Sequence, residues 1–391
     1  MKFVLLSDYY EPIIKSGSII IGDLAKELIN NGHQVNIITF VDKQNKRFEV
    51  SKNNNIQIYR IKSPTRSFGK IGRLWAEIRY SSKIINCIKS ERLNKIDGII
   101  CYSPSIFYGA AIKWMKKTYK VDSYLIIRDI FPKWALDSGL LKKGLLYKYF
   151  KRIERNLYSN SNFIGIEAKS DLSYFHNYGL NKSISIEVLN NWGSQISEID
   201  DKFGKTLLKK NRVNIVYGGN MGDAQDLLSL IKKIDFKGLK NKSDLYLIGS
   251  GNQFDKIKKI IKKRSLTNVF ILPAIDRELY LSVMKNADIG LVSLGSKMLS
   301  NNYPLKMIGY MQMGIPILAS VNKNNEMINT MSQNNIGLVS LASDLEMFNK
   351  NLKDMISRKE MRLKQGKNAL SLFDKKFTVS VAYSQIFRHF E

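Results

Sequence analysis

Residues 1–40 decide the fold, and they read MKFVLLSDYYEPIIKSGSIIIGDLAKELINNGHQVNIITF. Residues 3–6 are a short apolar run, the pattern of a parallel strand that is buried on both faces. Apolar residues then recur at helical spacing over 19–31, and Gly32 stands where a helix would end. A second apolar run follows at 35–40. This order predicts a βαβ unit and hence a doubly wound parallel sheet.

The same alternation continues along the 391 residues. The first half carries further predicted strands at 56–61, 98–102, 123–127, 163–166 and 184–189, and a helix at 71–93. After a polar stretch at 190–212, which we interpret as a linker, a new series of strands begins at 214–217, 245–248, 269–272, 289–292 and 315–319. We therefore predict an α/β protein with two Rossmann-like domains, since one core rarely serves so long a chain.

The composition narrows the class of partner. The chain carries 62 Lys and Arg against 34 Asp and Glu, a formal net charge of +28. Such a charge favours nucleic acid, anionic lipid or phosphorylated substrates as partners. The alternative is compositional bias, because Lys, Asn and Ile are abundant throughout. The two cysteines form no CxxC pair, so the sequence predicts neither a zinc site nor a disulfide framework.

Glycines follow two neighbouring strands of the second half. Gly218, Gly219 and Gly222 follow the strand at 214–217, and Gly249-Ser250-Gly251 follows the strand at 245–248. In open α/β sheets ligands bind beyond the carboxyl ends of the strands, where glycines let backbone amides approach a phosphate. Neither segment is the GxGxxG of dinucleotide enzymes, and no Walker A sequence occurs. The pair predicts a nucleotide site, although glycine after a strand also has purely structural uses.

A resemblance to a known family rests on several of these segments taken in order. "IVYGGNMGDAQDL", "LIGSGN", "NADIGLVSL" and "YPLKMIGYMQMGIPILAS" resemble the donor half of GT-B glycosyltransferases. The opening βαβ segment and "IIRDIFPKWALDSGL" resemble the other half of the same enzymes. The group that the chain resembles is the family-4 retaining enzymes of O-antigen and capsule assembly, especially the WbuB-like group.

The resemblance implies two domains facing a central cleft. We expect an acceptor-binding domain at 1–195, a nucleotide-sugar donor domain at 196–374, and a C-terminal helix at 375–391 that crosses back to the first domain. It also implies a retaining transfer from a UDP-sugar to a lipid-linked glycan, with no metal and no cofactor other than the donor substrate. The expected partners are therefore a nucleotide sugar and a polyprenyl-linked glycan acceptor.

The donor residues implied by the resemblance are spread over the second half. Lys306 is the catalytic candidate beside the diphosphate, and the residues expected to bind the donor there are Gly219, Asn220, Gly249, Gly251, Pro273, Ala274, Asn302, Pro304, Leu305 and Glu326. The chain also departs from the family pattern. Asn302 and Tyr310 stand where many family-4 enzymes have two glutamates, and Asn220 stands where an arginine is usual. Roles tied to those charges do not carry over.

In the first half, Ser16 and Gly17 are expected to face the donor phosphates, and Asp129 is the catalytic candidate. Asp129 directly follows a predicted strand, where a carboxylate can orient the acceptor hydroxyl or take its proton. The structural alternatives are that Asp129 caps the next helix or pairs with Arg128. Asp8, after the first strand, is the second candidate for the same role.

Two basic stretches of the first half, 60–95 and 142–155, contain interleaved aromatic residues. Cations beside aromatic and aliphatic side chains suit an anionic membrane surface. Trp75 lies on the apolar stripe of the helix at 71–93, so we expect it in the core. No run of 18 apolar residues occurs, and residues 3–6 are too short for a signal peptide. We expect a cytoplasmic protein, peripheral at the inner face of the plasma membrane.

Two other functions stay open on the sequence. A UDP-sugar epimerase of similar two-domain fold would also bind a nucleotide sugar. A basic nucleic-acid-binding protein would explain the charge, but no helix-turn-helix, RNP or zinc-finger signature occurs, so we do not expect nucleic acid as a partner.

Overall fold

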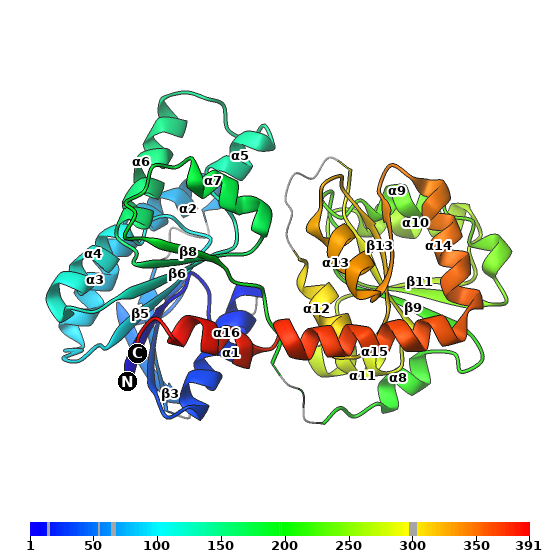
Figure 1. Ribbon diagram of the computed structural model, residues 1–391, viewed down its shortest axis with the longest axis horizontal. Helices are drawn as coiled ribbons and strands as arrows, with labels where there is room; N and C mark the ends of the chain where they lie inside the picture. The colour runs from blue at the N-terminus through cyan, green and yellow to red at the C-terminus, as the bar shows by residue number, and fades with distance from the viewer. Residues whose placement is uncertain (14–15, 54, 64–67, 195, 197, 297–302) are drawn as a thin grey trace. The chain divides into compact units, whose positions relative to one another are not determined.

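The computed structural model describes residues 1–391 except 14–15, 54, 64–67, 195, 197 and 297–302. The chain divides into two compact units, each built around its own sheet (Figure 1). The first unit comprises Met1–Ser194 and Val379–Glu391, and the second comprises Gln195–Thr378. No helix of the described residues is long and apolar enough to cross a membrane.

The first unit is built on an eight-stranded sheet in the order β3-β4-β2-β1-β5-β6-β7-β8. All neighbouring strands are parallel except β3 and β4, which pair antiparallel at the edge. The strands are β1 Lys2–Leu6, β2 Gln34–Val41, β3 Phe48–Asn53, β4 Ile56–Lys62, β5 Gly98–Ser103, β6 Ser123–Ile127, β7 Phe163–Ile166 and β8 Ser185–Val188.

The α-helices of this unit are α1 Ser16–Asn30, α2 Gly69–Ile78, α3 Tyr80–Ser90, α4 Gly109–Tyr119, α5 Lys133–Asp137, α6 Leu145–Ser159, α7 Leu172–His176 and α16 Val379–Phe387, with a short 3-10 turn at Lys169–Asp171. Val4 and Leu6 of β1 belong to the core that includes side chains of α3, α4 and α6. On the other face of the sheet, Phe3 packs against Phe387 and Phe390 of the C-terminal segment. The predicted doubly wound arrangement is therefore confirmed for this unit.

The helix predicted at 71–93 is wrong in two respects. It is two helices, α2 and α3, separated at Arg79. Trp75 is also not in the core, because its side chain is 54% exposed, together with Ile71 and Ile78. The face of α2 that turns inward instead carries Ala76 and Glu77, and Glu77 is satisfied there by Arg73 and by the Ser105 hydroxyl. The apolar stripe of α2 thus faces outward, and the contacts of Glu77 lie on the opposite side of the helix.

The second unit has a wholly parallel sheet in the order β11-β10-β9-β12-β13-β14. The strands are β9 Val213–Asn220, β10 Ser243–Ser250, β11 Val269–Leu272, β12 Ile289–Ser293, β13 Ile317–Val321 and β14 Gly337–Leu341. Side chains alternate between two cores along them. Ile215 and Tyr217 of β9 face one core, and Val216 between them faces another.

The α-helices of the second unit cover both faces of this sheet (Figure 1). They are α8 Lys202–Leu207, α9 Leu227–Lys233, α10 Phe254–Lys263, α11 Arg277–Lys285, α12 Leu305–Gln312, α13 Glu326–Asn334, α14 Leu345–Ser357 and α15 Lys359–Lys376, with a 3-10 turn at Lys237–Leu239. The stretch 190–212 is not a plain linker, because it contains α8, which packs against α11. There the Gly204 amide donates to the Ser282 hydroxyl at 2.9 Å.

Helix α16 belongs to the first unit through specific contacts. Tyr383 lies 3.0 Å from His33 Nε2, and Gln385 donates to the Val188 carbonyl at 2.8 Å. Glu187 of β8 binds both Arg388 and His389. Burial opposes ionisation of Glu187, but hydrogen bonds from Tyr124, Gln385 and His389 and the charge of Arg388 outweigh it and lower its pKa.

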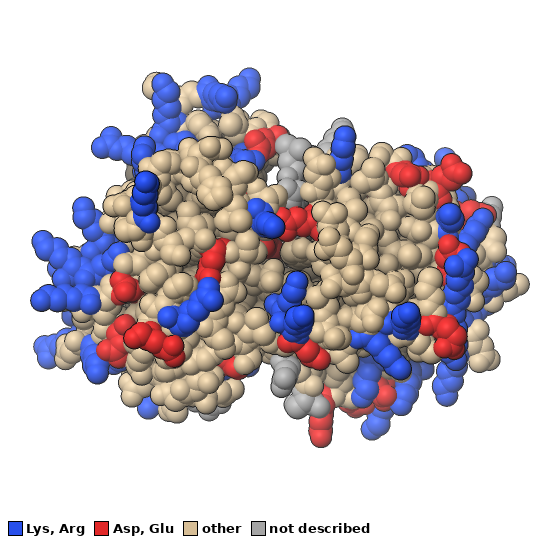
Figure 2. Space-filling model, in the orientation of Figure 1, with Lys and Arg blue, Asp and Glu red and all other residues tan. Residues whose placement is uncertain are grey.

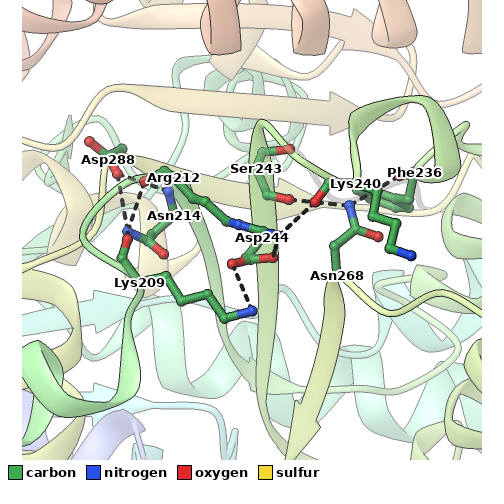
Figure 3. A network of polar contacts seen from close by, with 9 residues as sticks. All are labelled: Lys209, Arg212, Asn214, Phe236, Lys240, Ser243, Asp244, Asn268 and Asp288. Carbon is green, nitrogen blue, oxygen red and sulfur yellow. Dashed lines mark hydrogen bonds and ion pairs between the residues drawn. The ribbon is translucent and has the colours of Figure 1, made fainter.

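A polar network fastens the amino ends of the strands in the second unit (Figure 3). Asp244 of β10 is fully buried, and it pairs with Arg212 at 2.8 Å and with Lys209 at 3.5 Å. Asp288 accepts a hydrogen bond from the Asn214 amide at the start of β9. These charged groups are bound by partners within the unit. We therefore look for a ligand site at the opposite, carboxyl edge of the sheet.

Candidate functional site

The two glycine loops meet at the carboxyl edge of the second sheet. β9 and β10 are paired there so that Gly249 lies opposite Gly219 and Ser250 lies opposite Asn220. A Cβ atom on Gly249 would lie 1.9 Å from the Gly219 carbonyl oxygen, and one on Gly251 would lie 2.5 Å from the Met221 carbonyl oxygen. Gly249 and Gly251 are therefore required for the approach of the two loops to each other. Gly219, by contrast, is exposed, with φ +122°.

Lys306 lies beside Gly219. Its Nζ is 3.7 Å from the centroid of the Tyr217 ring, and a Cβ atom on Gly219 would lie 3.7 Å from the same nitrogen. No described acidic residue forms an ion pair with Lys306. Burial without such a partner lowers the pKa of Lys306 to about 7. A bound anion would supply the missing negative charge and favour the ammonium form.

The loop after β9 is held in place by its own side chains. Asn220 donates through Nδ2 to Gln225 Oε1 at 2.9 Å, and the Gly222 amide approaches the same oxygen at 3.3 Å. Asp223 accepts hydrogen bonds from Asn252 and Gln253 of the neighbouring loop, and these bonds lower its pKa. These contacts hold the loop after β9 against the loop after β10.

The remaining predicted donor residues lie on the same edge but further along it. Pro273 and Ala274 follow the edge strand β11, and Glu326 begins α13 after β13. Pro304 and Leu305 start α12, the helix that carries Lys306. Asn302 lies outside the described residues. Close contacts join Gly219, Gly249, Gly251, Asn220 and Lys306 into one cluster.

Tyr310 stands where many family-4 enzymes have a glutamate, and here it is a structural residue. Its side chain is fully buried. Its hydroxyl donates toward the carbonyls of Val216 and Leu291 and accepts from the Gly218 amide. The cluster around Lys306 therefore includes no carboxylate from this position.

In the first unit, Asp129 follows β6 at the carboxyl edge of the sheet. Neither structural alternative applies to it. Pro132 is the residue that begins α5, without a side-chain cap, and Arg128 turns away to donate to the carbonyls of Leu189 and Asn190. No hydrogen bond or ion pair of the Asp129 carboxylate reaches another described residue. Asp129 is exposed, but partial desolvation by nearby protein atoms raises the pKa of its carboxyl group.

Ser16 and Gly17 form the start of α1, also at this edge. A Cβ atom on Gly17 would lie 2.8 Å from a ring carbon of Tyr102 at the end of β5. Close packing against Tyr102 therefore accounts for Gly17 without a ligand. Ser16 is exposed.

Sequence reasoning missed Glu167 at the same edge, and it missed the partners of Asp8, its second candidate there. Glu167, directly after β7, is buried and accepts a hydrogen bond from Asn191. Asp8 is buried, accepts a hydrogen bond from the Tyr108 hydroxyl and lies 3.7 Å from Arg73. The position of Glu167 immediately after an apolar strand was a usable signal. The contact of Arg73 with Asp8 was not predictable in this way, because it depends on the orientation of α2.

Among the described residues, no group of three or more His, Cys, Asp or Glu side chains could hold a metal ion. The carboxyl edges of the two sheets differ in the chemical groups that they present. The edge in the second unit offers backbone amides and one desolvated ammonium, which together suit a phosphate. The edge in the first unit offers a carboxylate with a raised pKa, which suits a hydroxyl.

Comparison with known proteins identifies the second unit. Residues 198–371 match the family described as "Glycosyl transferases group 1". A protein from Pseudomonas aeruginosa called "Probable glycosyltransferase WbjE" is 23% identical over 244 residues, which are 60% of this chain and 57% of that protein. The chain thus spans little more than half the length of this curated relative.

Solved structures cover nearly the whole chain. A sucrose-phosphate synthase from Thermosynechococcus elongatus has a TM-score of 0.75 at 14% identity, over 99% of this chain and 98% of that one. An E. coli structure described as trehalose-6-phosphate bound with UDP-2-fluoro glucose has a TM-score of 0.74 at 11% identity, over 100% of this chain and 99% of that one. WaaG, a glycosyltransferase involved in lipopolysaccharide biosynthesis, has a TM-score of 0.70 at 14% identity, over 99% of each chain.

These likenesses and the two parallel sheets define the class. The chain has the GT-B fold, as predicted. Over residues 198–371 it is similar to glycosyltransferases of group 1. The closer relation to the WbuB-like group stays a prediction.

Proposed function

We propose that this protein is a retaining glycosyltransferase that moves a sugar from a UDP-sugar to a lipid-linked glycan during surface polysaccharide assembly. The observation that carries the proposal is Lys306, a desolvated lysine beside Gly219 at the carboxyl edge of the group 1 domain. Its neighbours in the described structure leave it without an acidic partner. A nucleoside diphosphate is a ligand that supplies that partner and that can also approach the exposed backbone at Gly219 and Asn220.

Catalysis then divides between the two units. Lys306 and the amides around Gly219 stabilise the negative charge that develops on the leaving diphosphate. Asp129 orients the acceptor hydroxyl or accepts its proton, and its raised pKa makes it a better base than an ordinary aspartate. No step requires a metal or a further cofactor, since cation and amides carry the charge.

A lipid-linked acceptor is supported by the surface of the first unit. The outward face of α2 carries Ile71, Trp75 and Ile78, each exposed, and Phe68 just before the helix is exposed too. Figure 2 shows Lys and Arg side chains gathered over α6 and over the side of α3 and α4. Directly after α2, the Arg79 guanidinium lies 5.6 Å from the centroid of the Trp75 ring. Apolar side chains beside cations suit the interface of an anionic bilayer. We therefore propose peripheral attachment to the inner face of the plasma membrane.

The relatives support the same substrate class. WaaG is described as involved in lipopolysaccharide biosynthesis, and the E. coli neighbour is described as bound to a UDP-sugar analogue. A polyprenyl-linked acceptor and a UDP-sugar donor are the corresponding substrates proposed for this chain.

The direct test incubates the full chain with UDP-sugars and lipid-linked glycans from bacterial membranes. Release of UDP together with glycan extension, with the donor's anomeric configuration kept in the product, supports the proposal. Interconversion of UDP-sugars without acceptor would show an epimerase instead. Salt-sensitive binding to duplex DNA without a response to any UDP-sugar would show a nucleic-acid-binding protein.

Membrane attachment is tested by cosedimentation with phosphatidylglycerol vesicles. The Ile71→Ser/Trp75→Ser variant should bind these vesicles several-fold more weakly, because it loses apolar area at the interface. Leu363→Ser, at an exposed apolar position on α15 of the second unit, is the matched control. Equal binding by all three proteins would remove α2 from the proposal.

A further inference from the structure

The first unit also contains a group of cations that is separate from the carboxyl-edge residues described above. They line a cavity of about 650 Å³ between α5, α6 and α7. Its walls include Lys133 of α5, Lys151, Arg152 and Arg155 of α6, and Tyr174 and Tyr178 from α7 and the turn after it. Within the described part of the chain, no acidic residue lines this cavity.

The charges around the cavity do not cancel. Lys133 pairs with Asp137, and Lys151 pairs with Glu154 at 2.5 Å. Neither Arg152 nor Arg155 forms an ion pair with a described acid, although Arg155 donates to the Gly179 carbonyl at 3.3 Å. The two guanidinium groups lie three residues apart on α6 and therefore on neighbouring positions of one face. Guanidinium groups in such an arrangement suit a phosphate, which they can bind in bidentate fashion.

The two tyrosines that line the cavity are held in place by an acid behind them. Glu154 is fully buried and accepts hydrogen bonds from the hydroxyls of Tyr174 and Tyr178, both at 2.7 Å. Burial and the charge of Glu154 raise the pKa of both tyrosines, which keeps them as neutral donors. Lys151 Nζ donates to Tyr174 Oη at 2.6 Å and lies 4.0 Å from the centroid of the Tyr178 ring.

The same contacts argue against a nucleic acid in this cavity. Stacking platforms for bases need free aromatic faces. Here the ammonium of Lys151 lies over both rings, 4.9 Å from the centroid of Tyr174 and 4.0 Å from that of Tyr178. The cavity offers charge and hydrogen bonds to a phosphate but no free ring to a base.

Apolar side chains lie next to these cations along α6. Leu145 is 87% exposed, and Leu146 and Tyr149 are also exposed. Leu145, Tyr149 and Arg152 follow the i, i+4, i+7 spacing of one helix face. A ligand bound by Arg152 would therefore have its charged part at the cavity and an apolar part beside Leu145 and Tyr149. That is the division of a lipid phosphate at a bilayer surface.

We propose that this cavity binds the diphosphate of the polyprenyl-linked acceptor. The inference rests on the proposed function and deepens it, since it assigns the lipid-phosphate end of the acceptor to α5, α6 and α7. Lys133 stands only four residues after Asp129 in the chain, so the same segment leads from the catalytic candidate into the cavity. The diphosphate held there would fix the distance between the membrane and the glycan end that reacts.

The test measures binding of farnesyl diphosphate to the full chain by calorimetry with UDP at saturation, so that the donor site is occupied. Farnesyl diphosphate should bind, inorganic pyrophosphate more weakly and farnesol not measurably. Arg152→Gln should weaken binding about 10-fold, and Arg152→Ala/Arg155→Ala about 100-fold, because each loses a charge-assisted contact. Lys113→Ala/Lys117→Ala, on the exposed face of α4, removes the same charge and should leave binding unchanged.

The outcomes separate this inference from the proposed function. Binding that is unchanged in Arg152→Gln and in the double variant, while UDP still binds, overturns the inference alone. Equal affinity for pyrophosphate and farnesyl diphosphate overturns the lipid source, as does complete competition by phosphatidylglycerol vesicles, which would make the occupant a general headgroup. A wild-type chain that binds farnesyl diphosphate but does not bind UDP would contradict the proposed function and leave the phosphate site standing.

Discussion

At the carboxyl ends of its strands the second unit presents glycines, amides and Lys306, whereas the first unit presents the carboxyl groups of Asp8, Asp129 and Glu167. Both edges are built by the same alternation of strand and helix. The difference shows that the fold supplies only the position, and that the residues after each strand select the ligand. Amides and an ammonium suit a diphosphate, while carboxyl groups suit the hydroxyls of a glycan.

The largest effect is expected from Asp129→Asn in the first unit. Loss of the carboxylate should lower transfer about 10²- to 10⁴-fold, the range for removing a positioned base. UDP binding should be retained, because the proposed diphosphate contacts of Lys306 and Gly219 lie in the other unit. Asp122→Asn is the control, since Asp122 precedes β6 at the opposite end of the same strand. Steady-state kinetics with both variants decide the point, and wild-type turnover in Asp129→Asn would remove it from catalysis.

In the second unit, Lys306→Ala should cost roughly 2–3 kcal/mol of transition-state stabilisation, about a 100-fold loss in kcat/KM. The ammonium supplies charge that the amides near Gly219 cannot replace. Lys258→Ala on α10 removes an exposed lysine of the same unit and should leave turnover unchanged. Equal turnover in the two variants would make Lys306 an ordinary lysine.

The two loop glycines should respond differently to a methyl group. Gly249→Ala should lower the free energy of unfolding by about 3 kcal/mol or more, because its Cβ would overlap the Gly219 carbonyl. Gly219→Ala should cost only about 1 kcal/mol, from the strained φ, and should mainly weaken UDP binding. Denaturant unfolding and UDP titration of both variants test this contrast. A stable Gly249→Ala that binds UDP poorly would instead make Gly249 a ligand contact.

The pH dependence of UDP binding should be smaller but diagnostic. Because the pKa of Lys306 is lowered to about 7 in the free protein, the ammonium that binds the diphosphate is lost as the pH rises. Affinity should therefore fall up to about tenfold per pH unit above 7. Lys306→Arg should give a flat profile between about pH 7 and 9, since arginine keeps its charge. Calorimetry across this range makes the comparison, and a flat wild-type profile would contradict it.

Much of this comparison follows from the sequence. Continuous apolar runs predict the buried parallel strands, and a glycine or acid directly after a run marks the carboxyl edge. Contacts across the fold decided the rest. The weak alternation of β3 concealed an edge strand, and the polar stretch 190–212 concealed α8. The outward turn of Trp75 accompanies the contacts of Glu77 with Arg73 and Ser105, which no periodicity reveals.

The glycines show the same limit at the candidate site. Their spacing predicted a phosphate loop, but Gly249 and Gly251 are accounted for by the contact between two loops. The residue that distinguishes the site is Lys306, whose desolvation and position over Tyr217 exist only in the folded unit. The resemblance in sequence pointed to Lys306, but its lowered pKa results from packing in the folded unit.

The most direct measurement is the thermal stability of the full chain with UDP in the presence of EDTA. UDP at one hundred times its dissociation constant should stabilise the wild-type protein by about 2.7 kcal/mol, and Lys306→Ala should lose most of this gain at the same concentration. A wild-type chain whose melting temperature does not respond to UDP, GDP or dTDP, with or without EDTA, would contradict a nucleoside diphosphate site at the carboxyl edge of the second unit.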